Sequence, residues 1–97
     1  MSTPESKTKN AIKKWLDARS IWYYMPVSNG MGRHGIPDFV CCWAGKFLAI
    51  EAKAAGKRAN TSALQDREIA AIRQAKGWAV VVDDVAQLDE YFADVIC

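Results

Sequence analysis

The chain has 97 residues, of which 51% are hydrophobic and 25% are charged, so its composition is that of one small globular domain and excludes a disordered segment. No apolar run approaches the roughly 20 residues that a membrane-spanning helix needs, and the first residues lack the apolar stretch of a secretory signal. We therefore expect a single domain over residues 1–97, in a soluble, cytoplasmic protein with no membrane partner.

Charge is distributed unevenly along the chain, although the net charge is only +2. Residues 1–60 hold ten Lys or Arg against four Asp or Glu, whereas residues 61–97 hold three against seven. This asymmetry favours an anionic partner for the basic part. Solvated helix faces that happen to be basic remain the alternative.

The chain contains three cysteines, Cys41, Cys42 and Cys97. An odd number, with two neighbours in one predicted strand, is a poor basis for disulfide bonds or for a shared metal. We expect buried free thiols in a reducing compartment.

The first part of the chain predicts a helix, a strand and a loop. Thr3 can cap a helix and Pro4 suits the first helical position, and apolar residues then recur at helical spacing, which predicts a helix over residues 4–18. Residues 21–25 are mostly aromatic or β-branched and predict a strand. The glycine-rich residues 27–35 predict a loop.

Two further apolar runs, at about residues 37–43 and 46–53, predict strands joined by a turn at Ala44 and Gly45. If the turn has two residues, paired positions sum to 89, and Asp38 faces Glu51 with Cβ atoms roughly 5 Å apart. Lys53 lies two residues beyond Glu51 on the same face. Facing carboxylates repel, and a divalent cation between them removes that penalty, with oxygen ligands suiting magnesium.

Two alternatives stay open, one to the metal site and one to this register. In the first, Lys53 simply neutralises Glu51, and Asp38 is exposed at the start of its strand. In the second, a longer turn that includes Lys46 changes the pairing of the two strands.

The last part of the chain predicts a helix, a strand and a second helix. Ser62 and Gln65 have the spacing of a capping box and open the first of these helices. Residues 78–82 are a continuous apolar run, typical of a central strand, and two aspartates then precede a final helix over about residues 85–95. The residues that we expect the first helix to bury are Leu64, Ile69 and Ile72. The resulting order, αβββαβα, indicates an α/β (α+β) fold with a four-stranded sheet flanked by helices.

Pro37-Asp38 followed by Glu51-Ala52-Lys53 is the PD-(D/E)xK pattern of metal-dependent nucleases. With their flanks, the segments GRHGIPDFV, FLAIEAKAAGKRANTSALQ and GWAVVVDD resemble the VRR-NUC (virus-type replication-repair nuclease) family, in its stand-alone phage-type form. The resemblance extends over about residues 5–90. It implies a restriction-endonuclease-like core with a mixed sheet.

The resemblance also implies a magnesium site, with manganese as a substitute. Asp38 and Glu51 would ligate the metal together with the backbone carbonyl of Ala52. Lys53 would orient or deprotonate the attacking water and offset charge in the transition state. 

Two further residues have implied roles at this site. Glu5 would act through a metal-bound water, or it is simply an acidic residue at a helix N-terminus. Gln65 would position the nucleophile or a phosphate, or it is the capping-box partner of Ser62; both roles of Gln65 can hold at once.

The loops at the ends of the predicted hairpin carry candidate phosphate contacts, which position a nucleic acid without reading its bases. These candidates are Ser28, Asn29, Arg33, His34, Lys57 and Arg58. The aromatic side chains are expected in the core or in an interface: Trp15, Trp22, Tyr23, Tyr24, Trp43 and Trp78.

The resemblance implies a metal-dependent, structure-selective endonuclease that cuts branched DNA such as Holliday junctions. A homodimer matches the two-fold symmetry of a four-way junction, and no nucleotide or organic cofactor is expected. The alternatives are a non-catalytic DNA-binding module with a nuclease fold, a nuclease acting on flaps or other non-junction DNA, and a structural oligomerisation protein. Joint retention of Asp38, Glu51 and Lys53 argues against a non-catalytic module, and the short chain leaves little room for the base-reading elements of a restriction enzyme.

Overall fold

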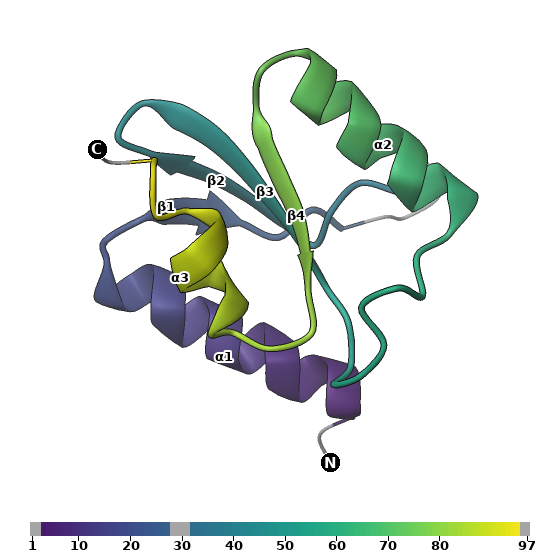
Figure 1. Ribbon diagram of the computed structural model, residues 1–97, viewed down its shortest axis with the longest axis horizontal. Coiled ribbons are helices and arrows are strands. Elements are labelled where there is room, and N and C mark those ends of the chain that lie inside the picture. Colours follow the sequence, from purple (N-terminus) through teal and green to yellow (C-terminus); the bar gives the residue numbers. More distant parts are fainter. Residues whose placement is uncertain (1–2, 28–31, 96–97) are drawn as a thin grey trace.

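The computed structural model describes residues 3–27 and 32–95. They form a four-stranded mixed sheet with helices on both faces, in the predicted order αβββαβα (Figure 1). The elements are α1 (Pro4–Ala18), β1 (Trp22–Tyr24), β2 (Phe39–Trp43), β3 (Lys46–Ala52), α2 (Ala63–Gln74), β4 (Trp78–Val82) and α3 (Gln87–Tyr91).

The strands lie in the order β1-β2-β3-β4. The first three are antiparallel to their neighbours, and β4 joins β3 in parallel after the α2 crossover. Within the described sheet β4 is therefore an edge strand, and the prediction of a central strand was wrong. Its continuous apolar sequence has another cause, because β4 has α2 packed on one face and α3 on the other.

The β2–β3 hairpin has the predicted register. Phe39 pairs with Ile50 and Trp43 with Lys46, which leaves Ala44 and Gly45 as a two-residue turn. Both turn residues have positive φ, 52° for Ala44 and 78° for Gly45, as a type I′ turn requires.

The two faces of the sheet bury different clusters. Helices α1 and α3, which lie beside each other in Figure 1, pack on the larger one, whereas α2 covers a smaller one on the opposite face. The residues of β3 alternate between the faces, so Leu48, Ile50 and Ala52 join the large cluster and Ala49 joins the small one. Glu51 follows the same alternation and lies on the α2 side.

The two long helices begin as predicted. The hydroxyl oxygen of Thr3 accepts a hydrogen bond from the backbone N–H of Ser6 at 3.1 Å, and Ser62 forms a complete capping box with Gln65. None of the described helices has both the length and the apolar character needed to cross a membrane.

The last helix was predicted too long. It spans only Gln87–Tyr91, and no side chain caps it. Asp83 and Asp84 are engaged elsewhere: Asp83 accepts hydrogen bonds from Gly56 and Gln87, and Asp84 accepts one from the backbone of Ala86.

Two expectations of burial, those for Leu64 and Cys42, were also wrong. Leu64 is 44% exposed because it lies in the first turn of α2, beyond the part of the helix that packs on the sheet. Cys42 is exposed because it points away from the α1 face, on the part of the sheet that α2 leaves open. Its strand neighbour Trp22 is 60% exposed on the same face, so of the two positions expected for it, core or interface, the core is excluded. Cys41 is buried as expected, and Cys97 lies outside the described residues.

Candidate active site

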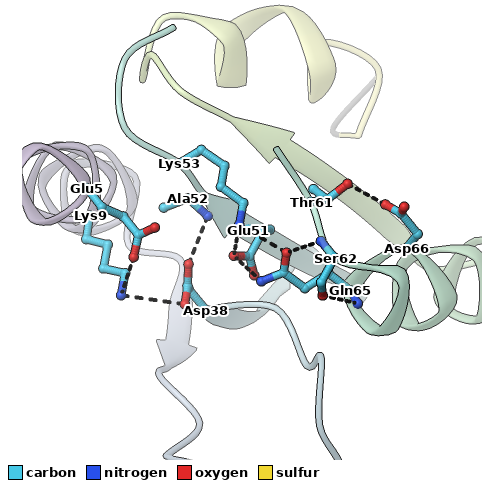
Figure 2. Close-up of polar contacts among 10 residues, drawn as sticks. All are labelled: Glu5, Lys9, Asp38, Glu51, Ala52, Lys53, Thr61, Ser62, Gln65 and Asp66. Atoms are coloured by element: carbon cyan, nitrogen blue, oxygen red, sulfur yellow. Dashed lines mark hydrogen bonds and ion pairs between the residues drawn. The ribbon is translucent and has the colours of Figure 1, made fainter. Parts of the chain in front are cut away.

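The charged residues of the hairpin lie at the end opposite its turn. Asp38 comes one residue before β2, Glu51 is the penultimate residue of β3, and Lys53 follows that strand. Figure 2 shows these side chains between the first turns of α1 and the start of α2. Three segments distant in the sequence thus supply charged or amide groups to one place.

Asp38 is fixed by a backbone contact to the neighbouring strand. The regular pairing of β2 with β3 ends at Phe39 and Ile50, and the Oδ2 atom of Asp38 then accepts a hydrogen bond from the backbone N–H of Ala52 at 3.0 Å. A carboxylate that replaces a carbonyl in this way continues the hairpin while its other oxygen stays available. That second oxygen, Oδ1, faces the ammonium group of Lys9.

Glu51 is only 3% exposed and lies between two polar partners. Its Oε2 atom accepts a hydrogen bond from the side-chain amide of Gln65 at 3.1 Å and lies 3.6 Å from the ammonium nitrogen of Lys53. Burial, together with the nearby carboxylate of Asp38, raises the pKa of Glu51 to about 7, although Lys53 acts in the opposite direction. The carboxyl group is therefore poised between its two protonation states near neutral pH.

Gln65 is the capping-box partner of Ser62, as predicted, and also contacts two charged residues of the candidate site. Its Oε1 atom accepts from the backbone N–H of Ser62 and from the Lys53 ammonium, each at 3.0 Å. Its amide group donates to Glu51. The capping box thus fixes the side chain that connects Glu51 with Lys53, so the helix start and the site share one residue.

Glu5 lies at the edge of this group, in the first turn of α1. Its Oε2 atom is 3.4 Å from the ammonium nitrogen of Lys9, which is 3.6 Å from Oδ1 of Asp38. Burial lowers the pKa of Lys9, but Asp38 and Glu5 together outweigh this effect and leave the pKa above its ordinary value. Glu5 therefore reaches Asp38 through a lysine.

Lys9 is the site residue that the sequence did not reveal. Its spacing of four residues from Glu5 on one helix is a signal of an ion pair. The contact with Asp38 depends on how α1 packs against the end of the hairpin, which the local sequence does not encode.

Arg33, which was predicted to contact a phosphate, pairs within the protein with a buried glutamate. Its guanidinium donates to Oε2 of Glu68 at 2.9 Å, and Arg67 donates to the same atom at 3.1 Å. Glu68 is 4% exposed. The hydrogen bond that its carboxylate accepts from Arg33 lowers its pKa, and this effect is larger than the opposing effect of burial. Arg33 itself is 69% exposed, so one edge of its guanidinium still faces solvent.

Three of the other candidate phosphate contacts are described, and they lie on two loops. His34 is exposed on the loop before Gly35, and Lys57 and Arg58 are exposed on the loop after β3. The Arg58 guanidinium donates to the hydroxyl of Tyr91 at 2.7 Å. Ser28 and Asn29 lie outside the described residues.

The oxygen donors near Asp38 suit a hard cation. Within residues 3–27 and 32–95, no three His, Cys, Asp or Glu side chains are grouped so that they alone could hold a metal. Burial and the neighbouring carboxylate of Asp38 raise the cost of ionising Glu51, and a divalent cation between the two carboxylates would relieve that cost. Since hard divalent cations take oxygen ligands and can keep several waters, two carboxylates are a donor set that fits such a cation.

Comparison with known proteins supports the fold. No protein-family model matches the sequence, and no curated protein matches it significantly. A solved structure described as a VRR_NUC domain superposes on the chain with a TM-score of 0.72 and 22% sequence identity. The superposition covers 96% of this chain and 98% of that one.

The chain thus has an α+β fold with a four-stranded mixed sheet and flanking helices. More particularly, its fold is that of a VRR_NUC domain, which confirms at the level of the fold the resemblance seen in the sequence.

Proposed function

We propose that the protein is a magnesium-dependent endonuclease that hydrolyses phosphodiester bonds in DNA. The observation that carries this proposal is that Gln65 joins Glu51 to Lys53 beside the fixed carboxylate of Asp38, in a domain with a nuclease fold. Burial and the facing carboxylate of Asp38 both raise the pKa of Glu51, a cost that a bound divalent cation would offset.

Each side chain has a role that follows from its contacts. The free oxygen of Asp38 and the carboxylate of Glu51, with the carbonyl of Ala52, would hold the cation. Bound there, the cation would polarise the scissile phosphate and lower the pKa of a coordinated water. Lys53, whose ammonium is held by Glu51 and Gln65, would orient that water and stabilise the negative charge that develops on the phosphate.

The surrounding loops would position the substrate. Lys57, Arg58 and His34 are exposed, and Arg33 keeps a solvent-facing edge while it holds Glu68. Contacts of this kind bind phosphates without reading the bases. Glu5 would complete the site through a metal-bound water, close to Asp38.

We further propose that the substrate is branched DNA and that the protein acts as a homodimer. A two-fold dimer presents two sites to the two-fold symmetry of a four-way junction. Trp22 and Tyr24, 60% and 52% exposed on edge strand β1, provide the apolar surface that a partner subunit would cover. We expect such a protein in the cytoplasm, where DNA is accessible.

The experiment compares linear duplex, flap, splayed-arm and four-way junction DNA of matched sequence, each with and without Mg²⁺. We expect cleavage only with the metal and fastest at the junction, with nicks in two opposite strands. Fastest cleavage of flaps would replace junctions as the substrate and leave the chemistry intact. If no DNA is cut with Mg²⁺ or Mn²⁺ but DNA is still bound, the protein is a non-catalytic DNA-binding module.

A further inference from the structure

Lys9 occupies the side of Asp38 that the hairpin leaves free. Among the described residues its ammonium group has two charged partners, Oε2 of Glu5 at 3.4 Å and Oδ1 of Asp38 at 3.6 Å. In Figure 2 it approaches Asp38 from α1, on the side opposite Glu51 and Lys53. The two lysines of the site thus differ: Lys53 is bound to Glu51 and Gln65, and Lys9 to the two carboxylates on the α1 side.

The position of Lys9 conflicts with a metal ion on Asp38. One oxygen of Asp38 is taken by the backbone of Ala52, so the oxygen beside Lys9 is the one available to a cation. A divalent ion there would lie within a few ångströms of the ammonium, and like charges at such a distance repel strongly. Both cations cannot keep their best contact with the same oxygen.

The Lys9 side chain has room to move. It is 28% exposed, and lysine carries its charge on a flexible four-carbon stem that can turn toward solvent. The Asp38 carboxylate, in contrast, is fixed by its hydrogen bond to Ala52. A bound metal would therefore move the lysine and leave the aspartate in place.

From these contacts we propose that Lys9 is a resident counter-ion of the metal site and is displaced when the divalent metal binds; this rests on the proposed function. In the metal-free protein its ammonium offsets the repulsion among Glu5, Asp38 and Glu51 and keeps the site in shape. Because the metal must replace this internal cation, Lys9 weakens metal binding. Lys9 is thus a positioning residue that sets the affinity of the site.

The test measures Mn²⁺ and Mg²⁺ dissociation constants by calorimetry on the full chain, for wild type, Lys9→Met and Lys14→Met. Lys14 lies on the same helix, is exposed and has no charged partner among the described residues, so its loss removes one positive charge without touching the site. We expect Lys9→Met to bind Mn²⁺ about five- to tenfold more tightly than wild type, and Lys14→Met to stay within about twofold.

If wild type binds Mn²⁺ and Lys9→Met binds it equally or more weakly, the metal does not displace Lys9 and this proposal is wrong. The proposed nuclease function would still stand. Failure of wild type to bind either metal overturns both. If Lys9→Met does not fold, Lys9→Gln removes the same charge with a polar side chain and carries the same expectation.

Discussion

At the scale of single residues, the strongest electrostatic feature is the buried carboxyl group of Glu51. Burial is the main cause of its raised pKa of about 7, and Asp38 adds to it. A group whose pKa is higher in the folded than in the unfolded state binds its proton more tightly when folded. The resulting stabilisation is complete below the ordinary pKa of 4.5 and is lost as the pH rises through about 7.

We therefore expect Glu51→Gln to stabilise the metal-free protein at pH 8. In a chelating buffer the difference from wild type should grow between pH 5 and pH 8 by on the order of 1–3 kcal/mol, because the neutral amide avoids the ionised state. Urea denaturation at several pH values measures it, with exposed Glu90→Gln as the control. A difference that does not change with pH would show that Glu51 is ionised throughout this range.

At the scale of elements, the loop that precedes Asp38 is held against the start of α2 by a glycine. A Cβ atom on Gly35 would lie 2.4 Å from the carbonyl oxygen of Leu64, and the residue has a φ of +84°. Gly56 has nearly the same φ, +81°, but a Cβ atom there meets nothing within 4 Å. The two glycines therefore have almost the same backbone conformation, but only Gly35 lacks room for a side chain.

Gly35→Ala should consequently be more destabilising than Gly56→Ala. Both variants carry the cost of a left-handed alanine, about 1 kcal/mol, and only Gly35→Ala also has to move the loop away from α2, at about 2 kcal/mol more. Chemical denaturation of both variants and of wild type gives the comparison. Equal losses of stability would mean that the loop does not pack on α2 as described.

The elements that local sequence determines were predicted well. The caps at Thr3 and Ser62 set both long helices, because each hydroxyl meets its N–H three residues away. The two-residue turn at Ala44 and Gly45 set the register of the hairpin. In this register Asp38 lies opposite Glu51, one position beyond the last regular pair, Phe39 and Ile50. These features depend on neighbours in sequence.

Features that depend on packing were predicted poorly. The aspartates expected to start the final helix instead bind the loop at Gly56 and the side chain of Gln87, so that helix is short. Lys9 and Glu68 entered no prediction, since their partners Asp38 and Arg33 are distant in sequence. Local pattern thus indicated Asp38, Glu51 and Lys53 but not Lys9, which contacts Asp38 from another element.

At the scale of the whole molecule, the excess of Lys and Arg in residues 1–60 is the feature most directly related to an anionic partner. Lys57 and Arg58 lie on the loop that follows β3 and Lys53, close to the candidate site in sequence and exposed to solvent. Lys46 is also exposed but lies at the hairpin turn, at the opposite end of β3. Comparing substitutions of these residues therefore distinguishes the effect of a positive charge near the site on DNA binding from that of a positive charge elsewhere on the surface.

Replacing Lys57 and Arg58 by alanine should weaken DNA binding equally for all sequences. The slope of log affinity against log salt concentration should fall by about two, one for each lost phosphate contact, as fluorescence anisotropy can measure. Lys46→Ala should leave the slope nearly unchanged. A change in sequence preference, or an equal effect of Lys46→Ala, would contradict a role confined to phosphates near the site.

The central claim is that Asp38, Glu51 and Lys53 form a metal-dependent nuclease site, and the cleavage assay with Lys53→Met tests it most directly. Wild type should cut a four-way junction in the presence of Mg²⁺. Lys53→Met should still bind Mn²⁺ and DNA but should cut at least about a hundredfold more slowly, because the group that handles the attacking water is gone. Full activity of Lys53→Met, or no cleavage by wild type with any divalent metal, would contradict the account.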